Sequence, residues 1–140
     1  MRKTMFLILI GLSLALAACS TVPVKSGPQE VTLEAAEFKF QPATIQVEAG
    51  RPVKVTMRNN GTIEHDWSVM EIPTTAIKAP SQSTMGHDMG GAKQPELHMA
   101  VMNGQMVQME FTPTRPGTFQ FYCTVAGHKE AGMVGTLVVR

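Results

Sequence analysis

The stretch TFQFYCTVAGHKEAGMVGTLVV, residues 118–139, decides the fold. Its two ends, Thr118–Tyr122 and Gly135–Val139, are short, rich in aromatic and β-branched residues and without helical periodicity, which predicts β-strands. Between them, Cys123–Met133 contains two glycines and no helix-length apolar pattern. The stretch therefore predicts two strands joined by a loop that carries a thiol, an imidazole and a thioether.

Upstream of this stretch, apolar and polar residues alternate in several short runs, which is the pattern of half-buried strands. Turn residues at Gly50-Arg51-Pro52 and Asn59-Asn60-Gly61 separate some of the runs, and no segment shows a convincing helical period. The chain is therefore predicted to be all-β, an antiparallel Greek-key β-sandwich of about seven short strands. The upstream strands are expected at Val31–Glu34, Ile45–Glu48, Val53–Arg58, Trp67–Met70 and Val107–Phe111.

The alternation fails between Ile72 and Leu97, where three prolines and three glycines interrupt the chain. This predicts a long insertion loop at about residues 73–97, and loops of such length are uncommon unless they are functional or disordered. Just downstream, the Asn103-Gly104 pair is typical of a tight turn, so residues 97–111 are expected to form a hairpin.

The first residues have the pattern of an export signal. Arg2 and Lys3 precede an almost wholly apolar run at residues 5–17, which is followed by Ala18 and Cys19. The run is too short to span a bilayer permanently. Residues 1–18 are therefore interpreted as a lipoprotein signal peptide and Cys19 as the lipid-bearing residue, the alternative being an ordinary signal peptide with a chance cysteine.

Residues 19–30 are polar and interrupted by proline and glycine, as expected for a flexible tether, so the folded domain is expected at residues 31–140. Lipid at Cys19 would hold this domain on the extracytoplasmic side of a membrane. By analogy with lipoprotein sorting, Ser20 in place of aspartate favours the outer membrane where the envelope has two.

The charge balance excludes a nucleic-acid-binding surface. Removing Arg2 and Lys3 with the signal leaves ten basic residues against eleven acidic ones, a formal charge of −1, and no basic patch remains. With Cys19 lipidated, Cys123 is the single remaining cysteine. An unpaired thiol in an oxidising compartment favours a metal ligand. Nothing in the sequence indicates an oligomer, so a monomer is expected.

Cys123, His128 and Met133 offer a thiolate, an imidazole and a thioether, a donor set that suits copper in both oxidation states. Taken singly, each has an ordinary structural explanation: a small buried side chain, a solvated loop histidine and a methionine of the core. One loop supplies three ligands, and His65, which follows the Asn59-Asn60-Gly61 turn and starts a strand, is the leading candidate for the fourth.

In this order and spacing, one upstream histidine and then Cys-x4-His-x4-Met before the final strand, the sequence resembles the cupredoxins, the type 1 blue-copper proteins. The loop spacing is most similar to that of the auracyanin and rusticyanin type. The resemblance covers residues 31–140 apart from the insertion. It implies that His65, Cys123 and His128 form a plane around one copper ion with Met133 weakly axial, and that His128 lies near the surface among apolar residues as the exit for an electron.

One position departs from plastocyanin and azurin, which have an asparagine directly after the upstream histidine. Here that residue is Asp66, and a carboxylate can only accept hydrogen bonds. We expect Asp66 to accept from the hydroxyl or backbone N–H of Thr124, joining the two ligand segments, and its charge to favour Cu(II) and lower the reduction potential.

The predicted function is a membrane-tethered one-electron carrier with unidentified redox partner proteins. The insertion also carries soft donors that suit Cu(I), so a second copper site is a further hypothesis; it would make the protein a copper chaperone or store. An oxidase or nitrite reductase would need more histidines than the two left unassigned, so no enzyme activity is expected. The residues considered for the second site are Met85, His87, Met89, His98 and Met99.

Overall fold

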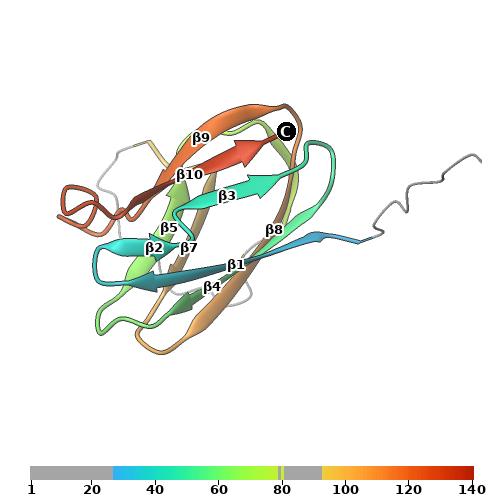
Figure 1. Ribbon diagram of the computed structural model, residues 1–140. Coiled ribbons are helices and arrows are strands. Elements are labelled where there is room, and N and C mark those ends of the chain that lie inside the picture. Colours follow the sequence, from blue (N-terminus) through green and yellow to red (C-terminus); the bar gives the residue numbers. More distant parts are fainter. Residues whose placement is uncertain (1–26, 79, 81–92) are drawn as a thin grey trace, which may run out of the picture.

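The computed structural model describes residues 27–78, 80 and 93–140, and over these residues the chain consists of strands and turns. Two five-stranded sheets pack face to face (Figure 1), one in the order β2-β1-β4-β8-β6 and the other in the order β3-β10-β9-β5-β7. The predicted all-β sandwich is therefore confirmed. The strands are β1 Gln29–Ala36, β2 Lys39–Gln41, β3 Thr44–Val47, β4 Val53–Asn59, β5 His65–Val69, β6 Thr74–Lys78, β7 Leu97–Val101, β8 Met106–Pro113, β9 Gly117–Tyr122 and β10 Val134–Val139.

The core lies between the two sheets because alternate side chains of each strand point inward. Val53, Val55 and Met57 of β4 are fully buried from one side. From the other side, Trp67 and Phe121 fill the centre, with their ring centroids 5.9 Å apart. This packed interior fixes the two sheets relative to each other, and it thereby fixes the ends of the loops that connect their strands.

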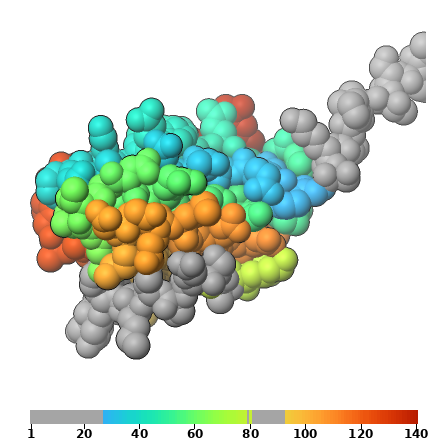
Figure 2. Space-filling model, turned by 90° about the horizontal axis from the view of Figure 1, so that it is seen from below, coloured from blue at the N-terminus to red at the C-terminus, as the bar shows by residue number. Residues whose placement is uncertain are grey.

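The expectation of a wholly antiparallel sandwich is wrong for two strand pairs. Strand β1 runs parallel to β4, and β3 runs parallel to β10. Between β1 and β4 the chain passes through β2 in the same sheet and β3 in the opposite sheet, so β4 returns beside β1 in the same direction. Figure 2 shows β1, β4 and β8 side by side on one face, although other strands separate them in the sequence.

Part of the predicted insertion loop is a strand. Thr74–Lys78 forms β6 at the edge of the first sheet and pairs with β8, with a register shift between Thr75 and Lys78. Four of its five residues are exposed, so no apolar alternation marks it in the sequence. Residues 79 and 81–92 of the predicted insertion lie outside the described residues. At the other end of the domain, β1 begins at Gln29, so the predicted tether at 19–30 is too long by two residues.

The hairpin expected over residues 97–111 is also wrong. Strand β7 belongs to one sheet and β8 to the other, so the turn at Asn103-Gly104 carries the chain across the sandwich. Gly104 has φ of 70°, a left-handed conformation that glycine adopts without steric cost. In the part of the chain that the structure describes, no helix has the length and apolar character needed to cross a bilayer.

Candidate metal centre

Three donor atoms converge at one end of the sandwich, where the β4–β5 and β9–β10 loops meet (Figure 1). The Nδ1 atoms of His65 and His128 are 3.3 Å apart, and Cys123 Sγ is 3.3 Å from His128 Nδ1. All three lie within 4.8 Å of one another. His65 and Cys123 are fully buried and His128 is 5% exposed. The structure thus brings together the two imidazoles and the thiol that the sequence singled out.

His65 is held in place by Asn59, the last residue of β4. The Asn59 amide donates to the carbonyl oxygens of Ile63 (2.7 Å) and Val101 (3.0 Å), and its oxygen accepts from Gly61 N–H (2.8 Å). Gly61 approaches the imidazole so closely that an added Cβ would lie 3.0 Å from His65 Nε2. Asn59 therefore shapes the loop that delivers His65, whereas the sequence indicated only a turn at this point.

Glu37, in the β1–β2 turn, supports the same loop from outside. Its Oε1 accepts hydrogen bonds from the backbone N–H (2.5 Å) and the hydroxyl (2.8 Å) of Thr62. The backbone hydrogen bond from Thr62 is the main reason why the pKa of Glu37 falls to about 2. The carboxylate is therefore ionised over the physiological range and secures the segment just before His65.

The loop between β9 and β10 closes on itself through backbone hydrogen bonds. Cys123 N–H donates to Met133 O (3.1 Å), and Met133 N–H donates to His128 O (2.9 Å). Gly127 and Gly132 have φ of 81° and 100°, conformations that L side chains adopt only with strain. Glycine is therefore suited to both positions, and the turns they make hold the three ligand candidates of the loop in one compact unit.

Asp66 joins the two ligand segments. Its carboxylate accepts from Thr124 N–H (2.9 and 3.0 Å to the two oxygens) and from the Thr124 hydroxyl (2.7 Å). Its own backbone N–H points at Cys123 Sγ, 3.4 Å away. This is the arrangement expected from the sequence, and it places a fully buried carboxyl group next to the cysteine ligand.

The Asp66 carboxylate has one further partner, Ser68, which in turn contacts His98, and the sequence indicated neither contact. It accepts a hydrogen bond from Ser68 Oγ at 2.9 Å, and Ser68 Oγ lies 2.8 Å from His98 Nδ1. Ser68 and His98 face each other across β5 and β7. That register joins residues thirty positions apart, so no local pattern could have revealed it.

The protein environment disfavours charge on the free ligands. Burial, followed by the nearby Asp66, raises the pKa of the Cys123 thiol to about 11. Burial, followed by the charge of His128, lowers the pKa of His65. Cys123 is therefore a thiol at neutral pH, and a metal ion must displace its proton on binding. A buried pair of imidazoles with a soft sulfur fits copper, whose two oxidation states both accept such donors.

Met133 is fully buried, and its backbone is hydrogen-bonded to the backbones of Cys123 and His128. Its thioether as axial ligand stays a prediction. Met99 does not fit the proposed second copper site, because its side chain lies in the core and is only 1% exposed. His98, on the opposite face of β7, is half-buried. The remaining candidates, Met85, His87 and Met89, lie outside the described residues, as does Cys19.

A β-sandwich with two buried imidazoles and a thiol at one end defines a cupredoxin-type copper protein. The chain belongs to the family described as copper binding proteins of the plastocyanin/azurin family, whose model matches residues 28–140. Copper is the cofactor that the family and the donor set define together. The resemblance of the sequence to the cupredoxins is thereby confirmed.

Individual relatives agree with this assignment. The copper-resistant cuproprotein CopI of Rubrivivax gelatinosus is 37% identical over 104 residues, which cover 74% of this chain and 61% of that protein. Auracyanin-A of Chloroflexus aurantiacus is 27% identical, with 99% of this chain and 97% of that protein covered. The crystal structure of dithionite-reduced auracyanin from Roseiflexus castenholzii has a TM-score of 0.61 and 19% identity, covering 81% of this chain and 99% of that chain; this likeness concerns the fold.

Proposed function

We propose that the protein is a one-electron carrier. The proposal rests on the observation that hydrogen bonds within the protein hold the ligands in position. Asn59 fixes the loop before His65, and Asp66 and Met133 hold Cys123. Copper at this centre supplies a couple between Cu(I) and Cu(II). Because the residues that hold it are fixed by the sandwich, they need to move little when the charge changes, which favours fast electron transfer.

Phe38 and His128 define the route by which the electron leaves. The Phe38 ring stands edge-on to the His128 imidazole, with centroids 5.2 Å apart, and is 44% exposed. His128 is itself nearly buried, so a partner protein would meet the aromatic ring first. An exposed apolar residue of this size against a metal ligand suits a transient partner that must dock and leave quickly.

Met133 completes the proposed set as a weak axial ligand. As a weak axial donor, the thioether would tune the reduction potential, and a leucine at this position, which donates nothing and is more apolar, would disfavour Cu(II) and raise the potential. We assign no catalytic role to any of the four ligands. Their donor atoms are buried among side chains, and a carrier needs no coordination position for a substrate.

A second candidate is copper handling, favoured by one observation: the 37% identity with a protein named as a copper-resistant cuproprotein. In this function the protein would bind copper to hand it on or to store it. Exchange of metal would then matter more than exchange of electrons, and the described centre would release Cu(I) to a competing protein.

We place the protein outside the cytoplasm, anchored by lipid on Cys19 and acting as a monomer on redox partner proteins. The basic start, the apolar run and the alanines before Cys19 support export. Mass spectrometry of the membrane fraction tests the anchor: a diacylglyceryl group on Cys19 is expected, and an unmodified cysteine in a released protein would refute it.

The central experiment adds Cu(II) to the purified domain, residues 27–140. An intense blue absorption from thiolate-to-copper charge transfer is expected at one copper per chain, and Cys123→Ser should abolish it. Stopped-flow mixing with a small reductant and oxidant should then cycle the colour without loss of metal. Transfer of copper to an apo acceptor faster than this cycling would favour copper handling instead.

A further inference from the structure

We propose that His98 is a positioning residue of the copper centre, acting through Ser68 and Asp66 on the segment that carries Cys123. The inference rests on the copper site, and it holds whether that site carries electrons or hands on metal. It assigns a role to a half-buried histidine outside the ligand set.

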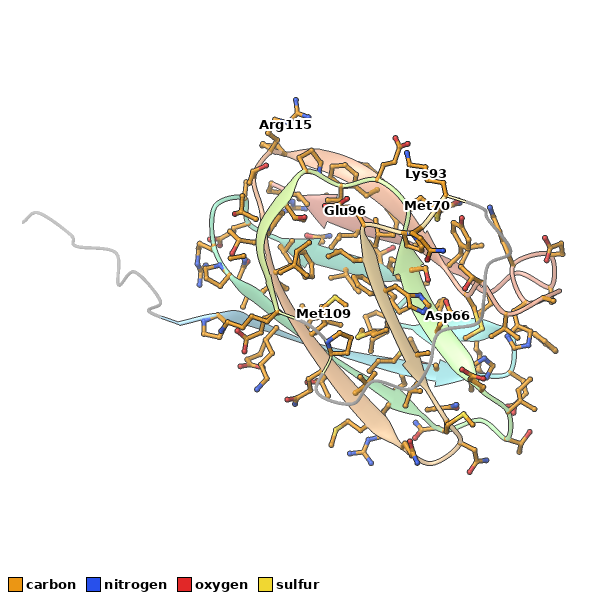
Figure 3. All side chains as sticks on the ribbon, turned by 180° about the vertical axis from the view of Figure 1, so that it is seen from behind. Asp66, Met70, Lys93, Glu96, Met109 and Arg115 are labelled. Carbon is orange, nitrogen blue, oxygen red and sulfur yellow. The ribbon has the colours of Figure 1, made fainter. Side chains whose placement is uncertain are left out.

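The three side chains form a continuous hydrogen-bonded line across two neighbouring strands. His98 Nδ1 is 2.8 Å from Ser68 Oγ, which is 2.9 Å from Asp66 Oδ1. Strand β7 lies beside β5, on which Figure 3 labels Asp66, and the register places Ser68 opposite His98. Asp66 and Ser68 are fully buried, so bulk water does not compete for their hydrogen bonds.

The direction of each hydrogen bond follows from the chemistry of the three groups. The Asp66 carboxylate can only accept hydrogen bonds, so the Ser68 hydroxyl donates its single hydrogen to the carboxylate. The Ser68 oxygen then meets His98 Nδ1 as an acceptor, and Nδ1 must carry a hydrogen. The line therefore selects the His98 tautomer protonated on Nδ1, and His98 in return keeps the Ser68 hydroxyl turned toward Asp66.

Asp66 transmits this orientation to the ligand. Its two oxygens also hold Thr124, the residue after Cys123, and its backbone N–H points at Cys123 Sγ. A carboxylate that receives the Ser68 hydrogen bond has part of its negative charge neutralised. Without His98 that hydrogen bond weakens, more negative charge remains beside the sulfur, and Cu(II) is favoured over Cu(I).

The first test uses the metal-free domain, so it is independent of any redox function. Nitrogen-15 chemical shifts of the histidine rings at about pH 8, where an unperturbed imidazole is neutral, report which ring nitrogen carries hydrogen. For His98 we expect hydrogen on Nδ1, and Ser68→Ala should move the tautomer balance toward Nε2. Hydrogen on Nε2 in the unaltered protein would overturn the proposal.

The second test is a redox titration of the copper-loaded variants. His98→Leu removes the donor and Ser68→Ala the relay, and each should shift the reduction potential downward. His98→Asn should restore most of the original value, because an amide N–H can donate from nearly the same place. The double variant His98→Leu/Ser68→Ala should shift no further than the larger single change, since both break one line.

An exposed side chain of the same sheet provides the control: Gln120→Leu on β9 should leave the potential unchanged. If His98→Leu and His98→Asn have the same reduction potential, His98 does not act through Ser68. The same conclusion follows if the shifts of His98→Leu and Ser68→Ala add in the double variant. If His98→Leu fails to fold, Ser68→Ala and the tautomer measurement still decide. A blue protein with none of these shifts would refute this inference alone, whereas the absence of blue copper would refute the proposed function.

Discussion

Replacing Asp66 with alanine should destabilise the domain far more than an ordinary surface substitution, because the carboxylate collects hydrogen bonds from three donors. These are the N–H and the hydroxyl of Thr124 and the hydroxyl of Ser68. Leaving a buried donor without a partner costs about 1–3 kcal/mol. Ser68 is fully buried, whereas Thr124 is only partly buried, so water can compensate some of the loss there.

We therefore expect the free energy of unfolding of the metal-free domain to fall by about 4 kcal/mol in Asp66→Ala, a large share of the about 5–15 kcal/mol typical of a domain. Urea titration followed by tryptophan fluorescence measures it, since Trp67 lies at the centre of the core. Asp66→Asn keeps one oxygen that can accept from Ser68 Oγ and Thr124 N–H, and the Thr124 hydroxyl, which contacts the other oxygen, can turn to accept from the new amide group. Its loss should be about 1 kcal/mol.

The asparagine variant also isolates the effect of charge on copper. The interaction between two nearby unit charges at an effective dielectric constant of about 20 is on the order of 2 kcal/mol, which corresponds to about 90 mV for one electron. Asp66→Asn should raise the reduction potential by a shift of this order. An unchanged potential would refute the electrostatic role of Asp66. A stability loss below about 1 kcal/mol in Asp66→Ala would refute its structural role.

Three further predictions concern the loops around the centre. Asn59→Ala should lower the free energy of unfolding by about 3 kcal/mol in urea titrations and broaden the copper absorption band, since it frees the loop before His65. Phe38→Gly should leave stability within about 1 kcal/mol, because relief of its left-handed backbone (φ 58°) offsets the lost aromatic contact, but should slow electron self-exchange measured by NMR line broadening. Glu37→Gln should remove the acid sensitivity associated with its lowered pKa.

The sign of the Glu37 effect follows from its pKa of about 2, below the ordinary value of 4.5 for a glutamate. A depressed pKa stabilises the folded state above pH 4.5, and this contribution disappears as pH falls toward 2. Unfolding free energies measured across that window should therefore fall less steeply in Glu37→Gln than in the exposed control Glu34→Gln. If the free energies of unfolding of Glu37→Gln and Glu34→Gln fall equally steeply with pH, the stabilising role of the Glu37 carboxylate is contradicted. An unaltered copper spectrum in Asn59→Ala and an unaltered self-exchange rate in Phe38→Gly would contradict the other two.

The two loop donors, Cys123 and His128, were predictable from the sequence because they lie five residues apart in one short loop. Met133, five residues further on, stays a predicted ligand. His65 could be named because it follows a turn and begins a strand. The pairing of Asp66 with Thr124 came from the resemblance to plastocyanin and azurin, in which the residue directly after the upstream histidine joins the two ligand segments.

What the sequence did not reveal depends on pairing between distant strands. The parallel pairing of β1 with β4 depends on a crossover through the opposite sheet, which leaves no trace in the alternation of either strand. The edge strand β6 has almost no buried residue, so a pattern of burial could not mark it. The contact of Ser68 with His98 follows from the β5–β7 register, which only the folded sheet defines.

The second sheet supplies two of the donor residues of the copper centre, and the first sheet supplies residues that support them. His65 begins β5 and Cys123 directly follows β9, both strands of the second sheet, while Asn59 and Glu37 come from β4 and the β1–β2 turn of the first sheet. The Asn59 amide also donates to Val101 O on β7, so it ties the sheets together beside the ligand. The positions of the donor atoms therefore depend on how the sheets pack on each other.

The contribution of both sheets explains how the geometry of the ligands is maintained in the metal-free protein, although burial opposes charge on them. Burial opposes ionisation of the Cys123 thiol and protonation of the His65 imidazole, so these groups do not hold one another together through charge. What holds them is the hydrogen bonding of Asp66 and Asn59 and the core packed between the sheets. The free energy of folding fixes the geometry beforehand, and copper then binds to groups that are already in place.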